Sequence, residues 1–138
     1  MNTLMVTHLV CCLLMTGIIW LVQVILYPNF FLVGKNEFSA VHRFHTQRIT
    51  WIVAPVMSLE LFTGAWLYLN SPNSFYFWNL VSIVSLWLLT AFVNVPTHNR
   101  LKYDSRISKK NLVYRNWPRT LIWTIRSLTL SISIGVLK

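Results

Sequence analysis

The hydrophobic residues of the chain fall into four long blocks and not into short alternating runs. Each block holds about 20 residues, the length that an α-helix needs to cross a hydrocarbon layer of ~30 Å. Backbone groups in such a layer have no water to bond, so helices are the natural way to cross it. The pattern therefore predicts four membrane-spanning helices, at 4–27, 49–69, 75–95 and 119–137.

Local sequence signals indicate where these helices begin and end. Pro28 and Pro96 stand at the ends of the first and third blocks, and Pro118 directly precedes the fourth, where proline favours a helix start. Ser39 is a candidate N-cap for an earlier start of the second helix. A tight turn at 70–73 separates the second and third blocks, whereas the other connections are long. We expect one all-α domain over 1–138, an integral membrane four-helix bundle.

Composition supports a membrane location. The chain of 138 residues is 55% hydrophobic and only 11% charged, whereas soluble domains carry roughly 25% charged residues. Too little polar surface is present to cover a soluble globule. We expect a multi-pass protein of the inner (plasma) membrane, with the lipid bilayer as its main partner.

The basic residues predict the orientation. The turn at 70–73 has none, and Lys138 is the only one at the C-terminus. The two long connections and their edges hold the others that bear on orientation: Lys35, Arg43, Arg48, Arg100, Lys102, Arg106, Lys109, Lys110, Arg115 and Arg119. The positive-inside rule places both long loops in the cytoplasm and both termini outside.

The formal net charge of +9 is explained by the same assignment. These charges flank the predicted spans, where they face the anionic leaflet of a membrane. Nucleic-acid binding would need a basic face interleaved with base-stacking aromatics on a soluble surface, and the sequence offers none. We therefore expect no nucleic-acid partner.

Histidines form one candidate site. His42 and His45 are spaced i, i+3 and so point the same way from a helix. His98 ends the third block on the same predicted side of the membrane. Three imidazoles at one level suit iron, copper or zinc, with an open position for chemistry, and we expect iron or copper. Solvated head-group contacts are the alternative for these histidines.

A polar seam forms the second candidate site. Glu60 lies near the centre of its span, where an ionised carboxylate needs a partner or a wet cavity. Arg126 in the fourth block is the expected partner, and Gln23 and Asn94 add polar groups on the other two helices. We expect these four residues to lie in the cytoplasmic half of the bundle. They either fix helix register or line a catalytic pocket.

The two features are separate sites on one helix. His42 and Glu60 are separated by ~27 Å along a helix axis, so no single ion can bind both. His8 is the one histidine expected in the outer half, and no other histidine shares its depth.

The first half of the chain resembles the small four-helix bacterial protoporphyrinogen oxidase family. The similar positions in the second block are Pro55-Val56-Met57, Leu59, Leu61, Gly64, Trp66 and Leu67. The resemblance implies a haem-linked role for His8, which holds a place near the start of the first helix like a haem-linked histidine of that family. The lysine and histidine of that family's third helix have no clear counterparts between Trp78 and Pro96.

The second half resembles the anthrone-oxygenase-like family of small four-helix membrane proteins. The motifs are Asn94-Val95-Pro96, Asn99-Arg100-Leu101, Arg115-Asn116-Trp117 and Arg119-Thr120. Stretches around Tyr27-Pro28 and from His45 to Glu60 are also similar to an uncharacterised bacterial membrane family. Together the resemblances imply a membrane oxidoreductase or haem-linked protein, with His8, His45 and His98 as candidate haem-binding residues.

Three functional hypotheses follow. The favoured one is a haem- or metal-linked membrane oxidoreductase or oxygenase, acting on an apolar small molecule, with Glu60, Arg126, Gln23 and Asn94 as its catalytic groups. The second is a small transporter or proton-conducting oligomer that uses Glu60 and Arg126. The third is a non-catalytic subunit of a membrane complex. A homo-oligomer or a membrane-complex partner is compatible with all of them.

Overall fold

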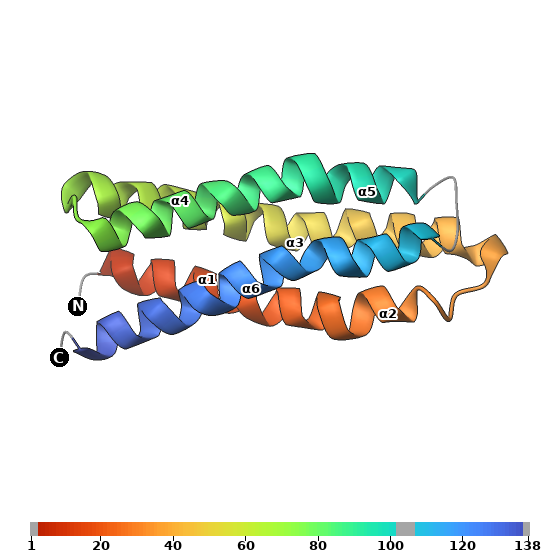
Figure 1. The fold of residues 1–138 in the computed structure, drawn as a ribbon, viewed down its shortest axis with the longest axis horizontal. Helices are drawn as coiled ribbons and strands as arrows, with labels where there is room; N and C mark the ends of the chain where they lie inside the picture. The colour runs from red at the N-terminus through yellow and green to blue at the C-terminus, as the bar shows by residue number, and fades with distance from the viewer. Residues whose placement is uncertain (1–2, 102–106, 137–138) are drawn as a thin grey trace.

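The computed structural model describes residues 3–101 and 107–136, and these form four helical segments that run side by side along one axis (Figure 1). The first and third segments each join three helical pieces in line. Their bounds are α1 (Thr3–Leu21), η1 (Val22–Leu26) and α2 (Tyr27–Asn29), then α4 (Ser74–Leu89), η2 (Thr90–Asn94) and α5 (Val95–Arg100). The second and fourth segments are the single helices α3 (Lys35–Asn70) and α6 (Ile107–Val136).

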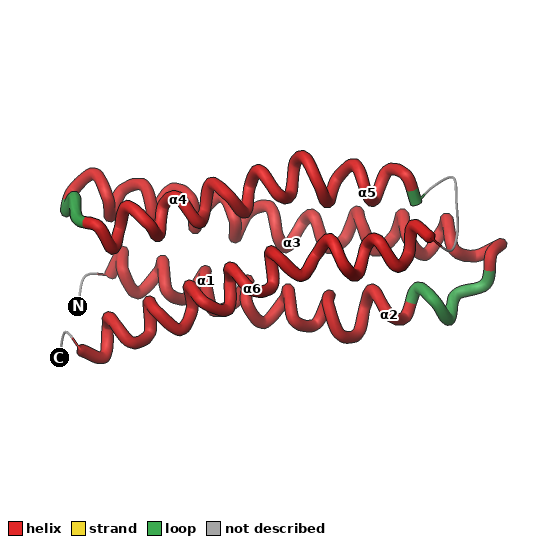
Figure 2. The backbone as a smooth tube through the Cα atoms, in the orientation of Figure 1, coloured by secondary structure: helices red, strands yellow, loops and turns green. Residues whose placement is uncertain are grey.

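Figure 2 shows that the connecting loops lie only at the two ends of the bundle. At one end, which we name the loop end, α2 connects to α3 and α6 begins (Figure 1). At the other, the terminal end, α1 begins, α6 ends and residues 71–73 join α3 to α4. Asn73 caps α4, because its Oδ1 accepts a hydrogen bond from the backbone nitrogen of Tyr76 at 2.9 Å. The predicted all-helical architecture and the predicted tight turn are confirmed.

Three of the segments are long and apolar enough to cross a membrane: Thr3–Asn29, Lys35–Asn70 and Ser74–Arg100. The helix α6 is not among them, and it carries two buried arginines, Arg119 and Arg126. A spanning helix at 119–137 stays a prediction. Large apolar side chains cover much of the outer surface, including Trp51, Leu69 and Phe92, each more than 70% exposed.

The helices extend beyond the predicted spans. The helix α3 begins at Lys35 after an extended Gly34, and α6 begins at Ile107, so Pro118 lies inside a helix. The predicted N-cap at Ser39 and the predicted start at Pro118 are therefore wrong. The added turns bury one face each, with His42 on α3 and Asn116 on α6, and such packing stabilises helical turns that hydropathy alone does not indicate.

Two prolines coincide with π-helical turns. Pro28 lies two residues after the end of η1, and Pro96 lies two residues after the end of η2, each in the next turn of helix. Proline cannot donate a backbone hydrogen bond, and its ring clashes with the carbonyl four residues earlier, which here belongs to the π-helical turn. Widening that turn lets both segments continue past their prolines, to Asn29 and Arg100. Such π-helical turns are frequent at functional sites.

Two apolar clusters form the core. One lies around the middle of the bundle and joins all four segments through residues such as Met15, Met57, Leu86 and Trp123. The other lies toward the loop end and includes Val22, Tyr27, Phe30, Phe38, Leu101 and Leu112. Polar side chains are buried beside both clusters, and they define the candidate sites.

Candidate functional site

A buried ion pair joins α3 to α6. The Glu60 Oε1 accepts from Arg126 Nη1 at 2.5 Å, and the side chains are 1% and 5% exposed. The second carboxylate oxygen, Oε2, accepts from the indole nitrogen of Trp123 at 3.1 Å. Both carboxylate oxygens are thus used inside the bundle, and the positive and negative charges compensate each other.

His8 completes this cluster from α1. The hydroxyl of Thr63 donates to backbone carbonyls of α3, so at 2.8 Å it accepts from Nδ1 of His8. Arg126 donates to Oδ1 of Asn79 at 3.1 and 3.2 Å, which turns the Asn79 amide nitrogen toward Nε2 of His8 at 3.0 Å. The hydrogen-bond network therefore assigns a neutral His8 with its proton on Nδ1.

The structure separates the four residues of the predicted polar seam. Glu60 and Arg126 lie at the level of His8, toward the terminal end, whereas Gln23 and Asn94 belong to a second cluster near the loop end. No other histidine was expected at the depth of His8, and the polar groups that accompany it there are Arg126, Asn79 and Thr63. The depth of Arg126 was underestimated because α6 begins at Ile107, which places Arg126 ~29 Å along the helix.

Gly64 lets α3 approach this cluster closely. A Cβ atom at position 64 would lie 2.5 Å from Cδ1 of the buried Ile83 and 3.2 Å from Cε1 of His8. We expect Gly64→Ala to lower the free energy of unfolding by about 1–3 kcal/mol, the usual cost of overpacking. Unfolding of detergent-purified protein, followed by circular dichroism, measures it.

Gly17 supplies the matched control for that variant. A Cβ atom there meets nothing within 4 Å. Gly17→Ala should leave stability unchanged or raise it by up to about 1 kcal/mol, because alanine favours helices. Equal effects at the two positions would contradict the close approach at Gly64.

A second polar cluster joins η1 and η2 to α6 near the loop end. Oε1 of Gln23 accepts from Asn116 at 2.9 Å, and Oδ1 of Asn116 accepts from Nη1 of Arg119 at 3.2 Å. With its amide oxygen turned toward Arg119, Asn94 accepts from Nη1 at 2.9 Å and from Nε at 3.2 Å. The cluster therefore surrounds the guanidinium of Arg119 with neutral acceptors.

A chain of three hydrogen-bonding rings lies at the loop end. Nε2 of His98 is 3.1 Å from the hydroxyl of Tyr27, and its Nδ1 is 2.9 Å from Nε2 of His42. With Tyr27 donating to His98 and His98 donating to His42, both contacts have a donor and an acceptor, so the three rings form one continuous hydrogen-bonded path. His45 lies beside it, with its ring centroid 5.3 Å from that of Phe30.

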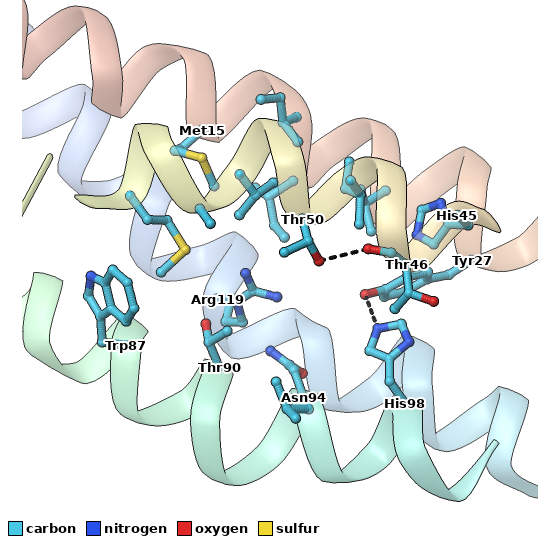
Figure 3. Close-up of a pocket in the computed structure, with 18 of the residues that line it drawn as sticks. Met15, Tyr27, His45, Thr46, Thr50, Trp87, Thr90, Asn94, His98 and Arg119 are labelled. Carbon is cyan, nitrogen blue, oxygen red and sulfur yellow. Dashed lines mark hydrogen bonds between the residues drawn. The ribbon is translucent and has the colours of Figure 1, made fainter. Parts of the chain in front are cut away.

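A cavity of about 350 Å³ opens beside this chain, between α1, α3 and the α4–α5 segment (Figure 3). Its apolar wall includes Met15, Ile19, Val53, Met57 and Trp87. Its polar groups come from all four segments and include Tyr27, His45, Thr90, Asn94, His98 and Arg119. An apolar cavity with a few convergent polar groups is the usual form of a small-molecule site.

The cavity opens sideways between α3 and α5. Thr50 and Ala54 on α3, and Val95 and Asn99 on α5, are exposed and also line the cavity. The backbone of α3 packs closely against that of α4 but lies farther from that of α5, which α3 reaches through the contact of His42 with His98. Divergence of these two antiparallel segments therefore creates a lateral entrance.

The volume limits what the cavity holds. A cavity of about 150 Å³ accommodates one benzene molecule, so 350 Å³ suits a molecule of about two rings. A haem macrocycle has four pyrrole rings and exceeds this volume. His8 and His98 also have both ring nitrogens engaged in hydrogen bonds, so as arranged neither offers a free nitrogen to haem iron.

The predicted metal ligands His42, His45 and His98 lie close together, but their side chains are not arranged to bind one metal ion. His42 and His98 form a hydrogen bond with each other, and His45 packs against aromatic rings. Within residues 3–101 and 107–136, no group of three His, Cys, Asp or Glu side chains is placed to hold a metal ion. Among the three, His45 has ring nitrogens without a hydrogen bond in the described part of the chain, and it faces the cavity. A bound metal stays a prediction.

Sequence reasoning missed several residues of these sites. Asn79, Trp123, Asn116 and Arg119 were not predicted as site residues, yet all four are buried and hydrogen-bonded. An asparagine within an apolar block, as at Asn79, is the signal that would have indicated one of them. Tyr27 ends the first predicted span, at 4–27, and hydropathy alone does not mark it as a site residue.

Comparisons with protein-family models, curated proteins and solved structures find no match. The resemblances based on short motifs therefore stay predictions.

Proposed function

We propose that this protein is a small integral membrane oxidoreductase that binds an apolar molecule of about two rings in the cavity at the loop end. The observation that carries the proposal is the cavity itself, an apolar space of about 350 Å³ with Tyr27, His45 and His98 at one end. The bundle would lie across the inner membrane with the loop end in the cytoplasm.

Membrane insertion is supported by three long apolar segments and by the apolar outer surface. The helix α6 runs along the other three (Figure 1), so it would cross with them and shield its buried arginines from lipid. The basic residues at the loop end favour the cytoplasmic side. A lateral entrance would admit molecules dissolved in the bilayer.

The chemistry is supported by the chain of Tyr27, His98 and His42. Reduction or oxidation of an oxygen-bearing ring moves protons together with electrons, so the site needs hydrogen-bonding groups beside the ligand through which a proton can be delivered or removed. This chain begins in the cavity and ends at His42, which is buried under Phe38. By contrast, Glu60 and Arg126 neutralise each other, which favours a packing role for that pair over proton transport.

The proposal is tested on protein purified in lipid nanodiscs. Absorption spectra are recorded oxidised and reduced, metal content is measured, and bound apolar molecules are extracted and identified by mass spectrometry. A redox-active molecule or cofactor at near-stoichiometric amount supports the proposal. A clean spectrum, no metal and an empty extract from native membranes would overturn it.

Filling the entrance should block the site. Ala54 lines the cavity and is exposed, so Ala54→Phe adds a ring there without disturbing the core. We expect at least about a tenfold loss of the co-purified molecule, because a bulky group removes the volume that the ligand needs. Mass spectrometry of the extract measures the loss.

Ser58→Phe is the control for this variant. Ser58 lies one turn further along α3, is exposed and does not line the cavity. It should keep the full amount of bound molecule. Equal loss in both variants would show that the ring acts through the helix surface and not through the cavity.

A further inference from the structure

Arg119 carries a buried charge at the cavity. Its side chain reaches from α6 toward Thr90 and Asn94 (Figure 3), and the residue is 6% exposed. Its hydrogen bonds use Nε and Nη1, on Asn94 and Asn116, while its guanidinium lies 5.1 Å above the ring of Trp123. Nη2 makes no hydrogen bond within the described part of the chain.

No carboxylate compensates this charge among the residues that the structure describes. The chain has three acidic residues, Glu37, Glu60 and Asp104. Glu60 pairs with Arg126, Glu37 is exposed at the start of α3, and Asp104 lies outside the described residues. The neutral amides around Arg119 satisfy hydrogen bonds but leave its positive charge in place.

The two buried arginines of α6, Arg119 and Arg126, therefore have different electrostatic surroundings. Arg126 meets a carboxylate inside a closed network and lines no part of the cavity. Arg119 lines the cavity and, among the residues that the structure describes, contacts only neutral groups. A buried cation without a counter-charge is costly in free energy, so the binding of an anion beside it would be strongly favourable.

A second donor at the cavity also lacks an acceptor. Nε1 of Trp87 is buried without a hydrogen-bond partner within the described residues, and Trp87 belongs to the cavity wall. Nη2 of Arg119 and Nε1 of Trp87 are therefore two donors of wall residues without an acceptor among the described residues. A ligand with acceptor oxygens complements such donors better than a hydrocarbon does.

We propose that the ligand of this cavity is an apolar molecule bearing one anionic oxygen group, carboxylate or enolate, which binds to the guanidinium of Arg119. The apolar body packs against Met15, Ile19 and Met57. This inference rests on the proposed function, because it names the substrate class of the same cavity. Arg119 acts as the residue that selects anions over neutral molecules of equal shape.

The test compares three probes of two fused rings on protein in nanodiscs, by isothermal titration calorimetry at neutral pH. The probes are 2-naphthoate, its neutral counterpart 2-naphthamide, and the enolate of 2-hydroxy-1,4-naphthoquinone. We expect the anions to bind at least about tenfold more tightly than the amide, as a charge-assisted hydrogen bond supplies. The two anionic probes distinguish a carboxylate from an enolate ligand.

Variants test which residue produces the preference for anions. Arg119→Gln should bring the anions to within about threefold of the amide, because glutamine keeps hydrogen bonds but removes the charge. Arg115→Gln removes the same charge one turn earlier on α6, at an exposed residue outside the cavity, and should keep the preference. Arg119→Lys should retain most of it, because lysine keeps the positive charge. Arg119→Met, which removes the charge from a long side chain, stands in if Arg119→Gln does not fold.

The outcomes separate this inference from the proposed function. If the amide binds as tightly as 2-naphthoate to the unaltered protein, the anion preference is overturned while the binding cavity stands. If none of the three probes binds, both are overturned. If the preference persists in Arg119→Gln, Arg119 is not the residue that selects the anion, and the inference also fails.

Discussion

Glu60→Leu is expected to destabilise the bundle by about 3–5 kcal/mol, the usual cost of breaking a buried ion pair by removing one partner. The substitution leaves the guanidinium of Arg126 buried without a counter-charge, and it removes the acceptor of Trp123. Unfolding in detergent, followed by circular dichroism, should show a large loss of free energy of unfolding.

Two further variants decide the cause of that loss. Glu37→Leu removes an exposed carboxylate from the same helix and should change stability by less than about 0.5 kcal/mol. Glu60→Leu combined with Arg126→Met should recover more than half of the loss, because apolar pairs often replace buried ion pairs at little cost. A double variant as unstable as Glu60→Leu alone would contradict the dominance of the unpaired charge.

Trp123→Ala is expected to cost about 3–5 kcal/mol, as large aromatic truncations in a core do. Trp123 is fully buried, packs in the central apolar cluster and donates to Glu60. Its ring also lies under Arg119, so it connects the ion-pair cluster with the cavity. Thermal unfolding in detergent by circular dichroism measures the effect.

Trp20 provides the matched comparison. It is 39% exposed and contacts the same helix through Thr124 and Trp117. Trp20→Ala should cost about 1 kcal/mol or less, since the truncated side chain leaves no closed cavity. If both variants lost equal stability, burial would not explain the role of Trp123.

Trp123→Phe refines the same prediction. Phenylalanine keeps most of the packing but not the donor to Glu60, so we expect a loss of about 1–2 kcal/mol from the missing hydrogen bond and the smaller ring. A loss as large as that of Trp123→Ala would assign most of the effect to the hydrogen bond.

The four helical segments, their antiparallel order and the turn at 70–73 were predictable from the sequence. Long apolar blocks and the polar residues between them encode these features locally. The helix ends were not predictable in the same way. The first turns of α3 and α6 are charged, and only the burial of faces that include His42 and Asn116 explains why they are helical.

The partnership of Glu60 with Arg126 was also foreseeable, because a lone carboxylate in an apolar span requires a cation. The addition of His8, Thr63 and Asn79 was not. Hydrogen bonds between residues as far apart as 8 and 79 depend on how the helices rotate about their axes and slide along each other. Hydropathy along the chain says little about either the rotation or the axial position of a helix.

By itself, therefore, the sequence determined the class of fold and which side chains are too polar to face lipid, since both follow from the local cost of burying polar groups. Tertiary structure alone decided which polar groups meet. Packing placed Glu60 opposite Arg126 but left Arg119 among neutral amides. It also spread α3 from α5 and so created the cavity, because side-chain packing sets the separation of helices.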